Sequence, residues 1–313
     1  MEIFTLSLNA VVPLFVVILL GYVAGKIGLI DDQSCNKLSI VAFRYVLPFN
    51  LFYNIYSGFD GITFDSGLML LVLFIQVGSF IIAFFLCRLV GKDRNQRGSA
   101  LLAIFRSNML VFGLPIAKVL LPSDELATFT IALLIILPLQ NIGSILGKEI
   151  YANAKGKLNW PEIIKNALTD PNMIGMYLGL IASILSIHLP ACLESGIESI
   201  SNMSSPFLLM LIGVGFDASY IVKNKRPVII SVVSRLIIVP LIFLIIISFV
   251  DLTTTERLIT LLTCAAPTAS TIYAFVEDGG LDKQLAKGTI VVSILCSMIS
   301  LTLWVYVINS LAG

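Results

Sequence analysis

Two polar interruptions stand out in a strongly apolar chain. The first is residues 105–115, FRSNMLVFGLP, which place Arg106, Asn108, Gly113 and Pro115 within a segment long enough to cross a membrane. Lipid cannot hydrogen-bond the backbone groups that such a break frees. An interrupted helix is therefore tolerated at membrane depth only where protein or a water-filled cavity satisfies those groups. The break predicts a binding site.

The second interruption is residues 264–271, CAAPTAST, which carry Pro267, Thr268 and Ser270. A proline inside a helix costs about 3 kcal/mol relative to alanine, so it marks a place where the helical backbone is no longer self-sufficient. Interrupted helices at corresponding positions of two halves indicate the substrate site of a secondary transporter. The amino ends of half-helices present N–H groups and a positive dipole end, which favour carboxylates.

The polar side chains at these breaks have more than one interpretation. Arginine costs about 2.5–3.5 kcal/mol at a helix centre, so Arg106 either raises anion affinity beside Asn108 or extends toward the cytoplasmic interface. The Asn108 amide either donates to a carboxylate or caps a helix. The hydroxyls of Thr268 and Ser270 bind substrate or an ion, or bond back to their own helix.

Other polar residues within the spans favour ordinary interpretations. Long basic side chains snorkel, which is the favoured interpretation of Arg44 and Arg235. For Asp217, Glu277 and Asp278, interfacial solvation is favoured over proton coupling. Three amides complete either polar packing or an ion site: Gln76, Gln140 and Asn141. The spans show no nucleophile beside a base, paired carboxylates or metal cluster, so we expect no enzyme, catalytic residue, metal or cofactor.

The elements that must position these residues are membrane helices. Of 313 residues, 58% are hydrophobic and 12% are charged, about half the charge of a soluble domain. The net charge of +1 gives no electrostatic case for a nucleic-acid partner. About 20 apolar residues span a bilayer, which predicts an all-α polytopic membrane protein. Ten candidate spans are 8–28, 36–56, 66–90, 99–120, 125–148, 171–189, 204–222, 227–250, 257–276 and 286–310.

Lysine and arginine alternate between the loops, and basic loops stay in the cytoplasm. Both termini are therefore predicted to be extracytoplasmic in the plasma membrane. A polar linker, 149–170, separates a first half, 1–148, from a second, 171–313. An offset of 158 residues aligns Pro13 with Pro171 and Gly21 with Gly179. Because each half holds an odd number of spans, we expect two inverted five-helix repeats.

Several short stretches resemble one transporter family in order and spacing over essentially the whole chain. They are Asn9–Pro13, Gly21–Tyr22, Leu47–Pro48, Ser107–Asn108, Gly113–Ile116 and Ala265–Ala269. The pattern is similar to the auxin efflux carrier family, which includes plant auxin carriers and bacterial malonate-type carriers. The resemblance implies a bile-acid/sodium symporter-like fold in which broken helices 4 and 9 cross, an elevator-like motion and organic anions as substrates.

The resemblance also assigns site residues by position. Those that match substrate-lining residues of relatives are Asn108, Leu110, Thr268, Ser270, Asn172 and Leu47, to which our own analysis adds Arg106. The crossover is expected at Gly113, Pro115 and Pro267. Ser270 departs from the pattern, being more polar than its equivalent in the auxin carriers.

The leading hypothesis is a secondary carrier of small organic anions. The alternative is a sodium-coupled symporter of the bile-acid type, whose sodium site needs several clustered oxygens, and here the acidic member is missing. The expected partners are the anion and the lipid bilayer. Whether the chain forms a homodimer is left open.

Overall fold

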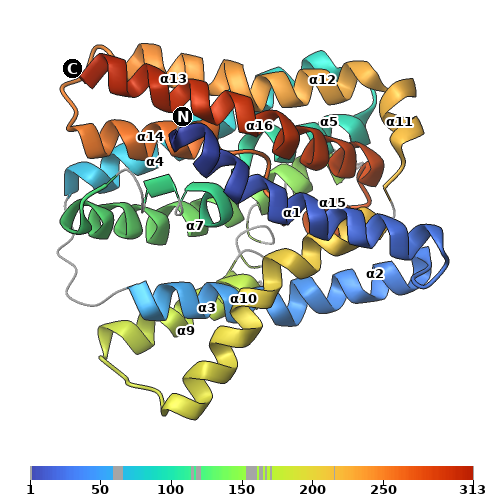
Figure 1. The fold of residues 1–313 in the computed structure, drawn as a ribbon, viewed down its shortest axis with the longest axis horizontal. Helices are drawn as coiled ribbons and strands as arrows, with labels where there is room; N and C mark the ends of the chain where they lie inside the picture. The colour runs from blue at the N-terminus through green and yellow to red at the C-terminus, as the bar shows by residue number, and fades with distance from the viewer. Residues whose placement is uncertain are drawn as a thin grey trace. The chain divides into compact units, whose positions relative to one another are not determined.

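The computed structural model describes residues 2–58, 66–113, 116–117, 121–152, 161, 165, 168–169, 171–214 and 216–312. These residues form helices joined by turns (Figure 1). In order they are α1 (Glu2–Lys26), α2 (Asp32–Val41), η1 (Ala42–Val46), α3 (Leu47–Gly58), α4 (Ser66–Leu86), η2 (Cys87–Val90), α5 (Arg94–Phe105), η3 (Met109–Gly113), α7 (Ser123–Ala152), α9 (Pro171–Ile184), α10 (Ala191–Val214), α11 (Ala218–Lys223), α12 (Lys225–Val233), η4 (Ser234–Ile238), α13 (Val239–Ile247), α14 (Thr254–Ala265), α15 (Ile272–Asp278) and α16 (Lys283–Ala312).

Six helical stretches of the described residues are long and apolar enough to cross a membrane, so the chain is a polytopic, all-helical membrane protein. They are Gln33–Ser57, Ser66–Val90, Ile131–Ala152, Ala191–Val214, Lys225–Ile247 and Lys283–Val307. Two further predicted spans coincide with shorter apolar helices, Phe15–Lys26 and Pro171–Ile184. The predicted spans 99–120 and 257–276 are divided between shorter helices. The count of ten stays a prediction.

The chain forms two compact units. Unit 1 comprises Met1–Phe15, Phe64–Ala154 and Asp217–Gly313, and unit 2 comprises Val16–Thr63 and Lys155–Phe216. Each unit therefore takes residues from both halves of the sequence. The proposed division at 149–170 is one of sequence and stays a prediction; α7 continues through Ala152, and most of the linker lies outside the described residues.

Close helix packing in unit 2 depends on glycines. A Cβ atom on Gly21 of α1 would lie 1.9 Å from the carbonyl oxygen of Met210 in α10. A Cβ atom on Gly175 of α9 would lie 2.3 Å from the carbonyl oxygen of Pro48 in α3. Within a bilayer, where the hydrophobic effect does not drive helices together, such small residues let backbones approach and gain dispersion contacts.

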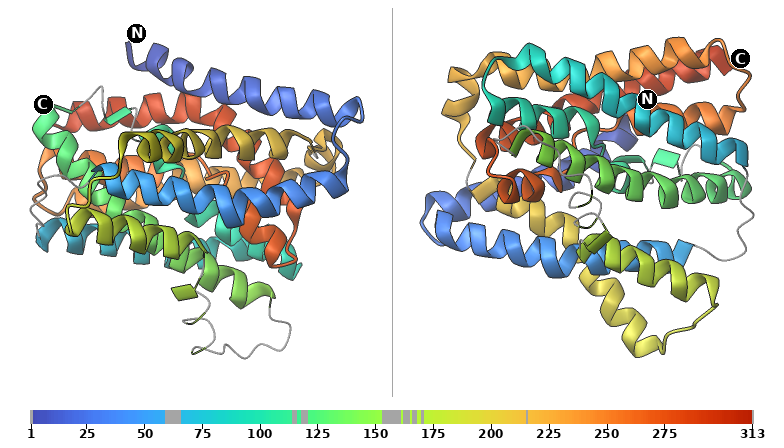
Figure 2. Two further views of the ribbon diagram at one scale, coloured as in Figure 1. Left: turned by 90° about the horizontal axis from the view of Figure 1, so that it is seen from below. Right: turned by 180° about the vertical axis from the view of Figure 1, so that it is seen from behind.

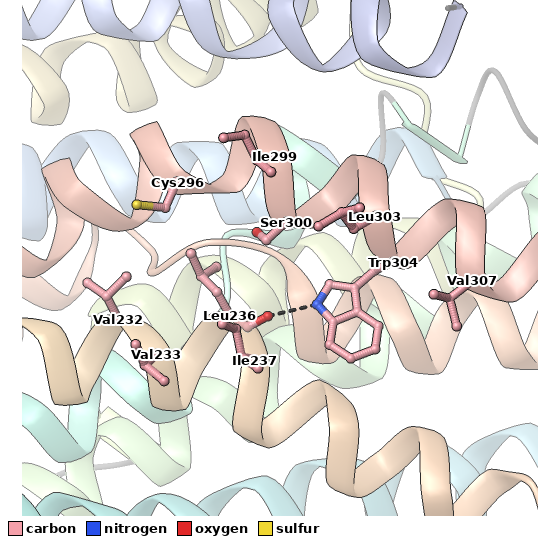
Figure 3. A pocket seen from close by; sticks show the side chains of 10 residues that line it. All are labelled: Val232, Val233, Leu236, Ile237, Cys296, Ile299, Ser300, Leu303, Trp304 and Val307. Carbon is pink, nitrogen blue, oxygen red and sulfur yellow. Dashed lines mark hydrogen bonds between the residues drawn. The ribbon is translucent and has the colours of Figure 1, made fainter.

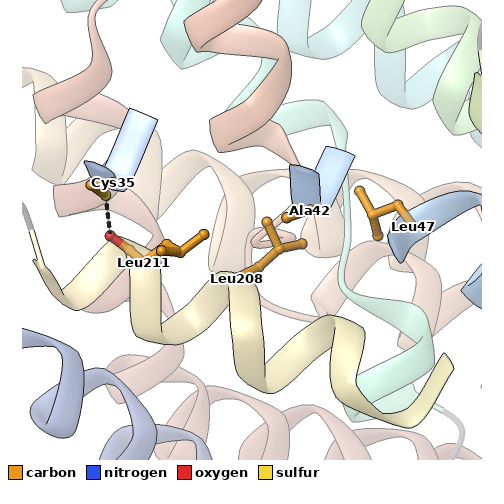
Figure 4. Packing of buried hydrophobic residues seen from close by; sticks show 5 residues of the cluster. All are labelled: Cys35, Ala42, Leu47, Leu208 and Leu211. Carbon is orange, nitrogen blue, oxygen red and sulfur yellow. Dashed lines mark hydrogen bonds between the residues drawn. The ribbon is translucent and has the colours of Figure 1, made fainter. Parts of the chain in front are cut away.

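A small apolar cluster also joins the helices of unit 2 (Figure 4). Its members are Cys35, Ala42, Leu47, Leu208 and Leu211. The thiol of Cys35 donates to the carbonyl oxygen of Leu211 at 3.4 Å, which ties the start of α2 to α10. The cluster thus holds α2, η1 and the start of α3 along α10.

Each of the three described π-helical turns ends two residues before a proline in the sequence. These pairs are η1 and Pro48, η3 and Pro115, and η4 and Pro240. Proline lacks an N–H group, and its ring clashes with the carbonyl four residues earlier. Widening the preceding turn relieves that clash, so the proline positions explain where the helices widen.

The turn η4 shows how the freed carbonyl is satisfied in unit 1. Leu236 lies four residues before Pro240, so its carbonyl has no α-helical donor. The indole Nε1–H of Trp304 in α16 donates to this oxygen at 2.7 Å (Figure 3). Helix α12 packs on α16 (Figures 1 and 2), and η4, which follows α12, contacts α16 as well. The bond therefore anchors η4 to α16.

Replacing Gly21 with alanine tests the packing of α1 on α10. The added methyl group meets the backbone of Met210, so the helices must separate, and overpacking of this kind costs about 1–3 kcal/mol. We expect Gly21→Ala to lower the melting temperature of the purified protein in detergent. The matched control is Gly196→Ala on α10, where a Cβ atom meets nothing within 4 Å and alanine improves helix propensity. A Gly21→Ala protein that melts with or above the wild type would contradict this account.

Candidate functional site

Two extended segments of unit 1 lie antiparallel to each other. They are Arg106–Asn108, after α5, and Pro267–Ala269, after α14, and an isolated bridge joins Ser107 to Thr268. On one side of the bridge the N–H of Asn108 donates to the Pro267 carbonyl at 2.9 Å, and on the other the N–H of Ala269 donates to the Arg106 carbonyl at 3.1 Å. We call these two stretches the paired segments.

Local sequence explains why the helices stop where they do. Pro267 disfavours the helical conformation of the residue before it, and Ala266 accordingly has φ −58° and ψ 143°. Arg106 is also extended, with φ −86° and ψ 116°, although no proline follows it directly. There the bonds to the other segment replace the helical ones. Helical structure begins again at Met109 and at Ile272.

The carboxyl end of α5 shows a full set of acceptors in use. A helix end leaves its last four carbonyl groups without intrahelical partners. The Thr268 hydroxyl donates to the Ala103 carbonyl at 2.9 Å. Nη1 of Arg235 donates to the carbonyls of Ile104 and Phe105 at 3.0 and 3.1 Å. The fourth, the Leu102 carbonyl, accepts the N–H of Arg106. Residues far away in the sequence therefore satisfy three of the four.

Arg235 also binds the end of α14. Its Nη2 donates to the Thr263 carbonyl at 2.6 Å, and its Nε donates to the Ala266 carbonyl at 2.9 Å. The side chain is only 1% exposed. The prediction that Arg235 snorkels is therefore wrong, because carbonyls freed at two helix ends give the guanidinium partners in the interior.

Arg106 is buried as well, at 5% exposure. Its Nη1 donates to the Ser144 hydroxyl at 3.1 Å and to the Gln140 carbonyl at 3.4 Å, and its guanidinium carbon lies 5.0 Å from the ring centre of Phe275. These contacts hold the charge among α7 and α15, which argues against the interfacial alternative. The Gln140 amide in turn donates to the Ser107 hydroxyl at 2.7 Å, so it packs against the paired segments.

Asn108 carries a donor that the described part of the chain does not use. Its side chain is 8% exposed, and its Nδ2 is buried without a hydrogen-bond partner among the described residues. Leaving a buried donor unpaired costs about 1–3 kcal/mol, so such a group in a native protein requires an explanation. A ligand acceptor provides one.

The expectation of free N–H groups at the amino end of the second half-helix is wrong for α15. The N–H groups of Ile272, Tyr273 and Ala274 each donate to the carbonyl three residues earlier, at 3.2, 3.2 and 3.3 Å. A tight first turn has taken up these donors. Side chains, rather than these backbone groups, are the donors left to meet a ligand.

Comparison with known proteins places the chain. The model of a family described as membrane transport protein matches residues 6–150 and 160–305. The chain belongs to the auxin efflux carrier family. It is similar to proteins named uncharacterized transporter YfdV in Escherichia coli (strain K12) and Shigella flexneri, each 22% identical over 311 residues, covering 97% of this chain and 98% of the relative. An uncharacterized transporter of Methanothermobacter thermautotrophicus is 22% identical over 313 residues, covering 96% and 98%. Family membership points to a carrier rather than an enzyme.

The predicted site residues of this transporter fall in both units. Unit 1 holds Arg106, Asn108, Leu110, Gly113, Pro267, Thr268 and Ser270, the last only 2% exposed. Of these, Leu110 and Gly113 belong to η3, directly after the first paired segment, whereas Pro115 lies outside the described residues. Unit 2 holds Leu47 and Asn172, both buried, on the helices α3 and α9 that pack on each other.

Two contacts of the site were not anticipated from the sequence. Ser293 of α16 accepts a bond from the N–H of Thr268 at 3.2 Å, and Ser144 of α7 accepts one from Arg106. A serine in an apolar helix gives no signal of its own, because it usually bonds back to its own helix.

The three carboxylates considered for proton coupling have ordinary partners. Asp217 caps α11 through the N–H of Ser219 at 2.8 Å, and hydrogen bonding by Ser219 lowers the pKa of its carboxyl group below the usual value. Asp278 pairs with Lys148 at 2.7 Å, and Glu277 pairs with Lys283 at 2.9 Å. These contacts favour structural over proton-carrying roles.

Substituting Thr268 with valine tests the bond that fastens one paired segment to α5. Valine keeps the shape but leaves the Ala103 carbonyl without its donor, which costs about 1–3 kcal/mol in a buried place. We expect a lower melting temperature in detergent. Thr260→Val is the matched control, because that buried hydroxyl bonds to the Glu256 carbonyl of its own helix, at 2.8 Å, and not to another described element. Equal losses in both variants would contradict the assigned role.

Proposed function

We propose that this transporter is a secondary carrier of small organic anions, with the paired segments as part of the substrate site. The observation that carries the proposal is the buried Nδ2 of Asn108 on one of those segments, which has no partner in the described ranges of the chain. An amide donor can bond a carboxylate oxygen without the desolvation cost of a second charge. The ligand would then complete the hydrogen bonding that the protein leaves open.

Charge at the paired segments favours an anion over a cation. Arg106 begins one segment and is buried beside α7 and α15. Arg235 is buried too, but the carbonyl groups at the ends of both helices offset its charge, so the argument rests on Arg106. Ionisable groups at membrane depth mark substrate pathways more often than ordinary packing. Carboxylates of metabolic size are the substrate class that fits both charge and donor.

We further propose that the chain has ten spans arranged as two inverted repeats whose broken helices cross at the paired segments. Contacts within unit 2 support the 158-residue offset. With this offset, Gly21 corresponds to Gly179 and Phe52 corresponds to Met210. Gly21 packs against Met210, and its equivalent Gly179 packs against Phe52, where a Cβ atom would lie 2.7 Å from the backbone carbonyl oxygen.

A second pair of contacts follows the same rule. A Cβ atom on Gly25 would lie 2.3 Å from the Val214 carbonyl oxygen. With the same offset, Gly25 corresponds to Ser183 and Tyr56 corresponds to Val214. The Ser183 hydroxyl donates to the Tyr56 carbonyl at 3.3 Å. Equivalent residues therefore make equivalent close contacts, as an inverted repeat requires.

In the mechanism we propose, unit 1 is the body that carries the substrate and unit 2 is the scaffold. Unit 1 contains the paired segments and the buried arginines. Unit 2 has the glycine-based packing that suits a rigid frame. An elevator-type movement of unit 1 across the plasma membrane, with both termini extracytoplasmic, would expose the site to each side in turn.

Counterflow in liposomes that contain only this protein tests the function. We expect unlabelled malonate, pyruvate or indole-3-acetate inside the vesicles to drive uptake of the same labelled acid from outside. Uptake that persists in sodium-free buffer separates the proposal from a sodium-coupled symporter. The absence of exchange for all three acids would contradict the proposed function.

Replacing Asn108 with leucine tests the donor that carries the proposal. Because Nδ2 has no partner among the residues that the structure describes, its removal should leave the melting temperature of the ligand-free protein unchanged or raise it. A bond to a charged group contributes about 1.5–3 kcal/mol, so ligand affinity should fall roughly tenfold to a hundredfold. The measurement is the ligand-induced thermal shift, with the exposed Asn202→Leu as control. Wild-type shifts in Asn108→Leu would exclude Asn108 as a ligand donor.

A further inference from the structure

Arg235 is buried among backbone carbonyl groups. Its four hydrogen bonds to described residues go to backbone carbonyl oxygens, two at the end of α5 and two at the end of α14. Each of its three guanidinium nitrogens takes part. A single side chain on η4 thus joins two helix ends that are far apart in the sequence.

The two helix ends also balance the charge. The carboxyl end of a helix is equivalent to about half a negative elementary charge. Two such ends face one guanidinium, so their sum matches its single positive charge. A buried cation is otherwise costly unless it is paired, and this arrangement supplies the pairing without a carboxylate.

The geometry requires arginine in particular. Guanidinium is planar and offers five donors in a fixed fork, whereas the ammonium of lysine is a compact charge with three donors. The base of the side chain is held too, because the neighbouring Leu236 carbonyl accepts the indole N–H of Trp304. Arg235 is thereby fixed at both ends, by η4 packed on α16 and by the two helix ends.

We propose that Arg235 is a positioning residue for transport, which holds the ends of α5 and α14 together and so keeps the paired segments in register. Both segments leave directly from the carbonyls that it binds: Phe105 precedes Arg106, and Ala266 precedes Pro267. Loss of the guanidinium frees those carbonyls and lets the two ends repel each other. The register that places the Asn108 amide then loosens. The transport part of this inference rests on the proposed function; the effect on the paired segments does not.

Hydrogen exchange followed by mass spectrometry tests the inference without any substrate. The variants are Arg235→Gln, which removes the charge, and Arg235→Lys, which keeps the charge but loses the fork. The matched control is Arg226→Gln, an exposed arginine at the start of α12. In Arg235→Gln we expect the amides of Asn108 and Ala269 to exchange at least tenfold faster than in the wild type. The exchange rates of these amides in Arg235→Lys should lie between those of the wild type and Arg235→Gln, and those in Arg226→Gln should match the wild type.

Peptides from unit 2 serve as the internal reference. Exchange in Arg235→Gln that is unchanged at the paired segments, or raised equally in unit 2, would overturn the inference, since the second result shows only general destabilisation. If Arg235→Gln does not fold, Arg235→Lys decides the matter by the same criterion.

Counterflow of labelled malonate then tests the role in transport: Arg235→Lys should raise KM at least severalfold, and an unchanged KM and maximal rate would overturn that role. If the wild type transports none of the acids in counterflow but the hydrogen-exchange pattern is as expected, the proposed function is overturned and the structural role of Arg235 stands.

Discussion

Backbone hydrogen bonding in a medium without water is the constraint on which unit 1 depends. Helices α5 and α14 stop inside apolar stretches, and each stop leaves carbonyl and N–H groups that lipid cannot satisfy. The structure meets this demand with three kinds of partner. The paired segments bond to each other, the Thr268 hydroxyl reaches α5, and Arg235 binds both helix ends. These bonds to other elements stabilise the break.

This arrangement also determines what is left for chemistry. The first N–H groups of α15 are used within its own tight turn, and those of Asn108 and Ala269 are used across the bridge. The N–H of Thr268 bonds to Ser293. The side-chain amide of Asn108 is then a donor that the described protein leaves open. Arg106 begins the same segment, and Ser144 and Gln140 hold its buried positive charge in place. An open donor and a buried positive charge on one segment are the basis of the anion proposal.

Much of the architecture could be predicted from sequence, because its causes are local. Composition and span length gave the membrane class, and Pro267 marks the end of α14 because proline excludes the helical conformation of Ala266. The partners of Arg235 could not be predicted. They are backbone carbonyls of distant residues, and a carbonyl has no residue type to recognise. The same reason hides Ser293, whose role depends on which backbone N–H group it meets. Snorkelling was predicted from the depth of Arg235 along its span, and that depth does not show which backbone carbonyls lie within reach.

The bridge between Ser107 and Thr268 is made by main-chain atoms on both sides. Its formation therefore does not depend on which side chains stand at Asn108 or Ala269. Substitutions at such positions can alter what the site recognises while the bonded backbone persists. Carriers descended from one ancestor can therefore change their substrates while keeping the same fold.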